Sequence, residues 1–313
     1  MSPVVLALAL LMIGAPTAAE EAAAPSRLAA ASLLLDAAAA GDRIVAVGER
    51  GHVVLSDDRG QSWRQARSVP TRQTLTGVFF ADAQRGWAVG HDAIVIHSDD
   101  GGESWTLQHA ALELEAPLLS VWFESPTRGI AVGAFGLRLE TSDGGRTWRR
   151  ADDGSDDLHL NGVFATSAAG VFVAAEAGVI YRSQGDGSWI RLELPYAGSL
   201  WGGLALGDGA ILVFGMRGHV FRSEDLGSSW SEVETGTDQS LVGAAELPGG
   251  KVYIVGLSGT LLSSSDGGRS FRASTRPHRR SLTAVTPGAG GLVLFGEGGA
   301  ELALDPLAAS PGP

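Results

Sequence analysis

The sequence predicts an all-β fold, a seven-bladed β-propeller in which each blade is a four-stranded antiparallel sheet. The first observation is a repeat that recurs every 40 to 43 residues along most of the 313-residue chain. The second is the content of each repeat, in which short apolar runs alternate with glycine-containing turns and a polar turn of the form S-x-D-x-G-x-S-W. A repeat of this length, built from short strands and tight turns, is typical of propellers with one blade per repeat.

One aligned position sets the number of blades. It follows an apolar run that we expect to be the second strand of each blade, and it is glycine in six repeats and alanine in one. The aligned residues are Gly48, Gly90, Gly133, Ala175, Gly215, Gly256 and Gly296. Seven such positions predict seven blades around a central channel.

Another apolar run precedes each of these positions and is predicted to be the innermost strand. The runs cover residues 33–35, 75–80, 119–123, 160–164, 200–206, 241–247 and 282–285. They are almost continuously apolar because blades pack face against face and bury both sides of a strand. A column of mostly small residues is expected where the blades crowd the axis: Gly77, Val121, Gly162, Gly202, Gly243 and Ala284.

The polar turn is an Asp box. In such a turn the Asp accepts backbone N–H bonds, the glycine permits a left-handed conformation, and the aromatic ring fills the space between blades. Five boxes are complete, with the key residues Ser56, Asp58, Gly60 and Trp63; Ser98, Asp100, Gly102 and Trp105; Thr141, Asp143, Gly145 and Trp148; Ser223, Asp225, Gly227 and Trp230; and Ser264, Asp266, Gly268 and Phe271. A sixth, at residues 183–189, is one residue short and lacks the aligned Asp.

Recurrence at one place in every blade favours a structural role for the boxes over calcium or carbohydrate binding. A calcium loop of the EF-hand type needs further oxygen ligands and a Glu at its twelfth position, which these turns lack. The acidic stretch at Asp152, Asp153, Asp156 and Asp157 fails the same test and is interpreted as a solvated loop. We therefore predict no metal site.

The repeat leaves room for one domain. We expect a signal peptide at residues 1–24, a single propeller at 25–304 and a disordered tail at 305–313. The apolar segment 4–13 and the small residues after it suit cleavage after Ala19 or Ala24, and the segment is too short to span a bilayer. The seventh repeat lacks an Asp box and an outer strand, so residues 27–31 are expected to close the ring beside residues 301–304.

Composition narrows the range of partners. The chain has no cysteine, which excludes disulfides and an N-terminal lipid anchor. A net charge of -12 argues against nonspecific binding to nucleic acid or anionic membranes, which requires excess positive charge. We expect an exported monomer without membrane insertion after signal removal, located in the periplasm or, in a phototroph, in a compartment like the thylakoid lumen.

Three phrases carry a family resemblance: VGERGHVVLSDDRGQSW at 47–63, LTGVFFADAQRGWAVG at 75–90 and LLSVWFESPTRGIAVGAFG at 118–136. They resemble the photosystem II stability/assembly factor family, and the similarity extends over essentially the whole mature chain. The resemblance implies an exported seven-bladed propeller with Asp-box, or BNR, repeats. It also implies a role in photosynthesis, in which the propeller binds membrane-protein assembly intermediates from the lumenal or periplasmic side.

The end of the propeller opposite the Asp boxes is the predicted binding face. Topology places there the loops that return to each inner strand and the turns between second and third strands, and variable loops on a fixed scaffold commonly carry function. This rim is predicted to hold Arg50, Arg72, Arg217, Arg276, Arg279, Arg280, His91, His159 and His278. We expect Arg72, Arg217, Arg279 and Arg280 to converge near the channel mouth and to pair with acidic groups of a membrane-protein or envelope-complex partner. The resemblance implies an arginine-rich patch on the same face.

Two other functions stay open. One is an accessory role in an envelope transport complex of a non-phototroph. The other is a BNR-repeat glycosidase, or sialidase-like enzyme, which would need a catalytic tyrosine or a carboxylate pair flanking one bond. Of the tyrosines only Tyr196 lies in a return loop, and no carboxylate pair stands at the inner-strand ends. The sequence therefore predicts a non-catalytic binding protein without catalytic residues, cofactor or metal.

Overall fold

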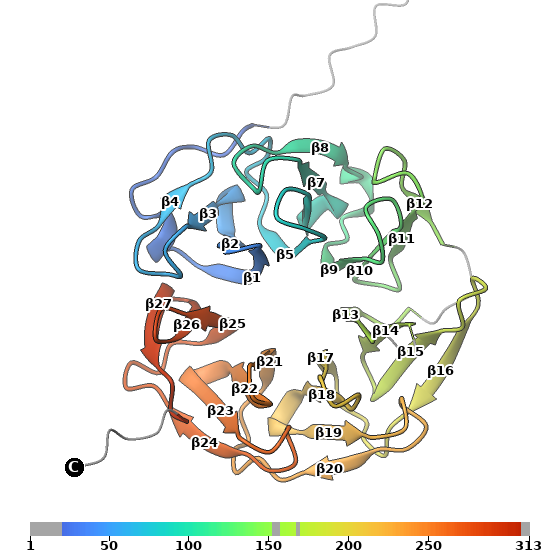
Figure 1. The fold of residues 1–313 in the computed structure, drawn as a ribbon. Helices are drawn as coiled ribbons and strands as arrows, with labels where there is room; N and C mark the ends of the chain where they lie inside the picture. Colours follow the sequence, from blue (N-terminus) through green and yellow to red (C-terminus); the bar gives the residue numbers. More distant parts are fainter. Residues whose placement is uncertain (1–20, 152–156, 167–169, 308–313) are drawn as a thin grey trace, which may run out of the picture.

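The computed structural model describes residues 21–151, 157–166 and 170–307, and it shows seven blades around a central axis (Figure 1). Within every blade the strands are antiparallel and follow the chain from the innermost to the outermost, as the chain order of each sheet shows. Six blades have four strands, and the seventh has three among the described residues. The predicted seven-bladed propeller is confirmed.

The strands fall into four classes by distance from the axis. The innermost are β1 (Leu34–Ala40), β5 (Leu75–Phe80), β9 (Leu118–Phe123), β13 (Leu160–Thr166), β17 (Leu200–Ala205), β21 (Leu241–Leu247) and β25 (Leu282–Gly288). The second are β2 (Arg43–Gly48), β6 (Gly86–Gly90), β10 (Gly129–Gly133), β14 (Gly170–Ala175), β18 (Ile211–Gly215), β22 (Lys251–Gly256) and β26 (Gly291–Gly296).

The third strands are β3 (Val53–Ser56), β7 (Val95–Ser98), β11 (Arg138–Thr141), β15 (Val179–Ser183), β19 (Val220–Ser223), β23 (Thr260–Ser264) and β27 (Gly299–Leu304). The outer strands are β4 (Arg64–Gln65), β8 (Thr106–His109), β12 (Arg149–Arg150), β16 (Trp189–Glu193), β20 (Ser231–Val233) and β24 (Arg272–Thr275). Short 3-10 turns complete the described elements: η1 (Ala29–Ala31), η2 (Glu49–Gly51), η3 (His91–Ala93), η4 (Leu112–Leu114), η5 (Met216–Gly218) and η6 (Leu257–Gly259).

The hydrophobic core is divided among the seven interfaces between neighbouring blades. Each interface has its own cluster of buried side chains; for example, Leu55 of blade 1 packs with Phe80 and Trp105 of blade 2. The second strands are buried along most of their length because a blade covers each of their faces. This arrangement explains why the sequence pattern is continuous rather than alternating.

A bulge near the start of each inner strand corrects one predicted position. Leu118 pairs with Gly133 and Ser120 with Val132, just as Leu75 pairs with Gly90 and Gly77 with Val89. The prediction that Val121 belongs to the small-residue column is therefore wrong: the third repeat begins with two leucines, and the strand pairs from the first, Leu118. The column consists of Asp36, Gly77, Ser120, Gly162, Gly202, Gly243 and Ala284.

Polar side chains near the bulges join one blade to the next. Asp36 Oδ2 accepts a hydrogen bond from Val78 N at 2.9 Å, and Ser120 Oγ accepts one from Val163 N at 3.2 Å. Thr76 and Asn161 instead donate to the first leucine carbonyl of the following blade. Thr283 Oγ donates to Leu34 O at 2.8 Å, so this pattern also joins blade 7 to blade 1.

The closure of the ring differs from the predicted strand pairing. Residues 29–31 form the turn η1, which lies against β27 without joining its sheet. Ala29 is buried in the core between blades 7 and 1, together with Phe295 and Trp63. A side chain at Gly299 would collide with Ala30 O, which shows how closely this turn is seated. The N-terminal segment therefore covers the seam rather than supplying a fourth strand.

The ends of the chain refine the predicted boundaries. Most of the predicted signal peptide, residues 1–20, lies outside the described residues. At the other end, Asp305 accepts hydrogen bonds from Lys251 and Tyr253, and Leu307 packs on the core between blades 6 and 7. The predicted tail boundary after residue 304 is therefore too early. Across the described ranges, no helix is long and apolar enough to cross a membrane.

Candidate partner-binding site

The turns between second and third strands present one residue per blade on the predicted binding face. In six blades the central residue of the turn has a positive φ; these residues are Arg50, Asp92, Phe135, Ala177, Arg217 and Ser258. The residue that follows is usually glycine, because a Cβ at Gly51 or Gly218 would clash with a carbonyl of the adjacent return loop. The six turns therefore share one backbone conformation, and this conformation sets the direction of the central side chain in each turn.

The return loop between blades 6 and 7 holds more of the predicted basic residues than any other loop of the rim. Of its four basic residues, two bind Glu301 on β27: Arg276 through an ion pair, and His278, whose Nε2 lies 2.9 Å from Oε2. Burial opposes ionisation of Glu301, but the hydrogen bonds from Arg276 and His278 outweigh it and hold the pKa of Glu301 below its usual value. Glu301 is thus a charged anchor for the loop.

The other two cations of this loop, Arg279 and Arg280, face outward. Both are exposed, and neither has an ion-pair partner among the described residues. The backbone holds them in place: Arg279 N donates to Arg276 O at 3.1 Å, and Arg280 N donates to His278 Nδ1 at 3.0 Å. Arg279 itself has a φ of 54°, an uncommon conformation for a side-chain-bearing residue. We call residues 276–280 the arginine loop.

A cavity of about 420 Å³ lies beside the arginine loop. Its lining comes from the return loop between blades 5 and 6, the η6 turn, the adjoining ends of β23 and β24, and the arginine loop. The lining residues are Gly236, Thr237, Asp238, Gln239, Ser258, Thr260, Thr275 and Arg279. The lining is mostly polar, and Arg279 is its only cationic side chain. The combination of a polar cavity and two displayed guanidinium groups suits an extended segment that carries carboxylates.

The remaining predicted rim residues do not join this site. Arg72 lies between blades 1 and 2, where it pairs with Glu21, whereas Arg217 lies in η5 on blade 5, across the ring (Figure 1). Arg72, Arg217, Arg279 and Arg280 therefore occupy separate sectors and do not converge at the channel mouth. The alignment showed that all four belong to one end, but it carried no information on their angular positions.

The other predicted binding residues are also spread around the ring. Arg50 and His91 are exposed in the turns η2 and η3 of neighbouring blades. His159 Nδ1 accepts a hydrogen bond from Phe135 N at 3.2 Å, and its ring packs edge-on against Phe135. His159 therefore supports a turn, and the arginine loop remains the densest group of positive charge on this face.

The Asp-box face has a different character, because the Asp carboxylates of the complete boxes accept hydrogen bonds within their own turns. In each complete box the Ser or Thr hydroxyl accepts the glycine N–H, as Ser98 Oγ does from Gly102 N at 2.9 Å. Hydrogen bonds from the side chain and backbone of Ser62 lower the pKa of Asp58 to about 2. No group of metal-ligating side chains occurs among the described residues.

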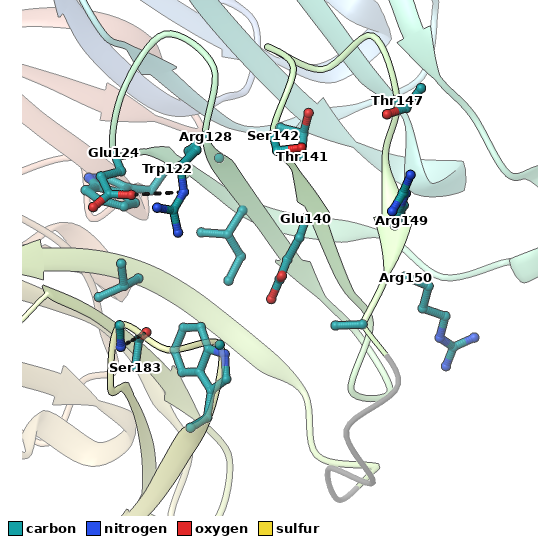
Figure 2. A pocket seen from close by; sticks show the side chains of 17 residues that line it. Trp122, Glu124, Arg128, Glu140, Thr141, Ser142, Thr147, Arg149, Arg150 and Ser183 are labelled. Atoms are coloured by element: carbon teal, nitrogen blue, oxygen red, sulfur yellow. Dashed lines mark hydrogen bonds and ion pairs between the residues drawn. The ribbon is translucent and has the colours of Figure 1, made fainter.

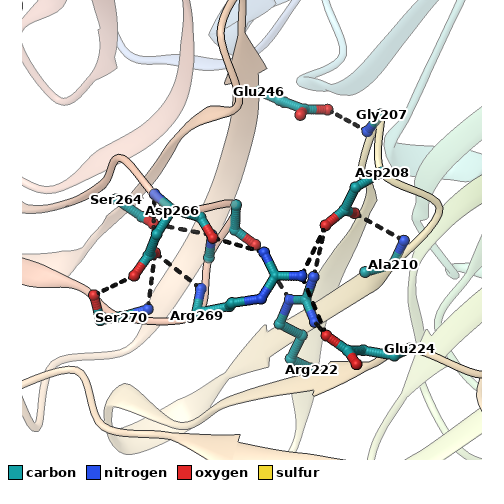
Figure 3. A network of polar contacts seen from close by, with 12 residues as sticks. Gly207, Asp208, Ala210, Arg222, Glu224, Glu246, Ser264, Asp266, Arg269 and Ser270 are labelled. Carbon is teal, nitrogen blue, oxygen red and sulfur yellow. Dashed lines mark hydrogen bonds and ion pairs between the residues drawn. The ribbon is translucent and has the colours of Figure 1, made fainter.

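On the Asp-box face of blades 5 and 6, two arginines and two carboxylates form an ion-pair network (Figure 3). Arg222 is buried; it binds Asp208 at 2.8 Å and also pairs with Glu224. Arg269 of the next blade approaches the same two carboxylates at 3.4 and 3.3 Å. These arginines tie two blades together, in contrast to Arg279 and Arg280.

One residue that the sequence analysis did not single out is Asp36. It replaces a small residue in the column nearest the axis and lines a central channel cavity of about 410 Å³. Burial raises its pKa to about 6, although hydrogen bonds from Val78 and Ala37 act in the opposite direction. The available signal was that Asp36 is a charged residue directly after the apolar run 33–35.

The fold and its rim define the class of this protein: a seven-bladed Asp-box propeller with a preorganised arginine loop on the face opposite the boxes. A family model described as "Photosynthesis system II assembly factor YCF48" matches residues 106–246 of the chain. The resemblance to photosystem II assembly factors is thus confirmed. No curated protein sequence matches the chain.

Solved structures give the same fold. A structure described as "YCF48 bound to D1 peptide" has a TM-score of 0.70 and 18% identity, covering 90% of this chain and 94% of the other. YCF48 from Cyanidioschyzon merolae has a TM-score of 0.66 and 17% identity, with 86% and 94% covered. Virginiamycin B lyase from Staphylococcus aureus has a TM-score of 0.62 and 16% identity, with 72% and 78% covered.

Proposed function

We propose that this protein is a non-catalytic binding scaffold, similar in role to photosystem II assembly factors, that holds an acidic segment of a membrane-protein partner. The observation that carries the proposal is the arginine loop, in which Glu301 binds Arg276 and His278 and leaves Arg279 and Arg280 displayed beside a polar cavity. The match to the assembly-factor family and the likeness to YCF48 bound to D1 peptide support it.

The contacts of Tyr196, the tyrosine that a sialidase-like enzyme would use, favour a binding protein over an enzyme. Tyr196 is the tyrosine of a return loop, and its hydroxyl donates to Met216 O at 3.0 Å. Its ring packs against His219 and Phe221, which places it in the support of a turn rather than in an open site. The likeness to virginiamycin B lyase is a likeness of fold at 16% identity.

Export is part of the proposal, and the N-terminal contacts favour cleavage after Ala19 over Ala24. Ala23 N donates to Val69 O at 3.0 Å, Gln65 donates to Ala24 O at 3.1 Å, and Glu21 pairs with Arg72. Cleavage after Ala24 would remove all three contacts. N-terminal sequencing of the mature protein distinguishes the two sites.

A pull-down from detergent-solubilised envelope membranes tests the proposed function. The tagged protein should recover a membrane protein, and the Arg279→Ala/Arg280→Ala double variant should recover at least about tenfold less, because charge-assisted hydrogen bonds contribute roughly 1.5 to 3 kcal/mol each. The matched control is Arg146→Ala/Arg272→Ala, which removes the same charge from two exposed sites away from the loop.

The outcomes separate the alternatives. Equal recovery by both double variants would move the binding site away from the arginine loop. The recovered partner also decides the setting, since a photosystem protein indicates photosynthetic assembly and a transporter subunit indicates an envelope transport complex.

A further inference from the structure

The incomplete Asp box of blade 4 folds differently from the five complete ones. Its strands β15 and β16 pair as far as Ser183 with Trp189, and Gln184 N donates to Ser188 O at 3.0 Å across the turn. Trp189 is therefore part of the outer strand, whereas Trp63 of a complete box precedes its outer strand. The missing residue converts a wide box into a straight, tight hairpin.

Complete boxes fill the space beside the preceding blade. A Cβ at Gly60 would lie 2.4 Å from Val293 of blade 7, and one at Gly268 would lie 2.6 Å from Leu212 of blade 5. At Gly185 and Gly187 of blade 4, a Cβ would meet no described atom within 4 Å. The blade 4 hairpin therefore does not reach blade 3.

The space left open is a cleft of about 340 Å³ between blades 3 and 4 (Figure 2). Its apolar lining is Trp122, Ile130, Val171 and Trp189, and charged side chains of blade 3 surround it. The buried cluster at this interface has six residues among those described, against eight in the two next smallest clusters. The cleft thus occupies space that buried side chains fill at the other interfaces between blades.

The cleft is lined by charged side chains of both signs. The lining includes Glu124, Arg128, Glu140, Arg149 and Arg150. Both glutamates are engaged, since Glu124 pairs with Arg128 at 3.3 Å and Glu140 pairs with Arg138 at 3.1 Å. Arg149 and Arg150 are exposed and have no ion-pair partner among the described residues. Among the described lining residues, two guanidinium groups are therefore left without an ion-pair partner.

We propose that the cleft is a binding socket for one aromatic or large aliphatic side chain of an acidic peptide segment. Its volume lies at the low end for ligand pockets, which suits a single side chain rather than a folded surface. Trp122 and Trp189 offer apolar contact to that side chain, and Arg149 and Arg150 are placed to meet flanking carboxylates. The socket lies on blades 3 and 4, apart from the arginine loop, and does not depend on the proposed function.

Fluorescence anisotropy with short labelled peptides tests the socket. The probe is Asp-Glu-Phe-Glu-Asp, compared with the same peptide carrying Gly in place of Phe and with Lys-Lys-Phe-Lys-Lys. The acidic Phe peptide should bind at least about tenfold more tightly than either comparison peptide. Equal binding of all three, or no binding of the acidic Phe peptide up to about 1 mM, overturns the proposal.

Variants assign the binding to the cleft. Replacing residues 183–189 with the eight-residue box of blade 6, SSDGGRSF, should close the cleft and abolish peptide binding while raising the melting temperature. Val171→Trp fills the cleft from its lining and gives an independent test if the graft does not fold. Arg149→Glu/Arg150→Glu should weaken binding about tenfold, whereas Arg279→Ala/Arg280→Ala should leave it unchanged. Retained binding in both filled variants would also overturn the proposal.

Discussion

At the scale of single residues, Asp36 is accommodated by a hydrogen bond, but burial makes its charged form unfavourable. The column nearest the axis favours small side chains because the blades converge there, and Asp36 is the charged exception. Its carboxylate takes the role that Ser120 has two blades away, accepting a backbone N–H of the next blade. The hydrogen bonds from Val78 and Ala37 stabilise the carboxylate form of Asp36, whereas desolvation destabilises that form by more.

The stability of the protein should therefore depend on pH through Asp36. Because burial raises the folded pKa from 3.8 to about 6, the contribution of this group is fully present below pH 3.8 and is lost as the pH rises through about 6. Relative to Asp36→Asn, the wild-type free energy of unfolding should fall by up to about 2 to 3 kcal/mol across this range. Urea unfolding at several pH values measures it. A wild-type advantage that grows with pH would contradict the assignment.

The Asp-box tryptophans give a second prediction at this scale. Trp105 is 3% exposed and should cost about 3 to 5 kcal/mol when replaced by Ala. Trp189 borders the cleft and is only partly buried, so Trp189→Ala should cost about 1 to 2 kcal/mol. Equal losses in thermal or urea unfolding would mean that the cleft is closed in solution.

At the scale of elements, the arginine loop depends on one carboxylate. Glu301→Gln keeps the shape of the side chain and removes the charge that holds Arg276 and His278. We expect a more mobile loop and weaker partner binding, with a loss of stability below about 2 kcal/mol because these groups are partly exposed. Hydrogen exchange of residues 276–281 measures the loop directly. Unchanged exchange in Glu301→Gln would show that the backbone alone fixes the loop.

The sequence predicted the strands and turns within each blade well, but it predicted contacts between blades and positions around the ring poorly. The repeat placed the inner strands and boxes in nearly all blades, because each is encoded by a local pattern of leucine, glycine and tryptophan. It missed the extension of β1 through Ala37–Ala40, because these residues lack the large apolar side chains of the other inner strands. It also showed a missing residue at 183–189 but not the cleft, since a cleft depends on the facing blade.

The candidate site was predictable only in part. Arg279 and Arg280 stood out because they are adjacent cations in a return loop on an acidic chain. Their separation from Arg72 and Arg217 depends on the angular position of each loop around the ring. The contacts of Arg276 and His278 with Glu301 depend on a strand from another blade. Neither the angular position of a loop nor its contacts with another blade can be predicted from the local sequence.

At the scale of the whole molecule, hydrogen bonds between blades make the closing interface similar to an internal one. Thr283 Oγ donates to Leu34 O across the closure, and Thr76 Oγ donates to Leu118 O within the ring. Thr283→Val and Thr76→Val should each lower the free energy of unfolding by about 1 to 2 kcal/mol. If Thr283→Val has no effect while Thr76→Val does, closure rests on the N-terminal segment instead.

The central claim is that this propeller binds its partner through the arginine loop, and site-specific photocrosslinking tests it most directly. A photoreactive phenylalanine analogue is placed at Pro277, an exposed and uncharged residue of the arginine loop, or, as a control on the Asp-box face, at Asp99, whose side chain is 76% exposed. In envelope membranes we expect a crosslink to a membrane protein from position 277 and none from position 99. A partner crosslinked from position 99 but not from position 277 would contradict binding through the arginine loop.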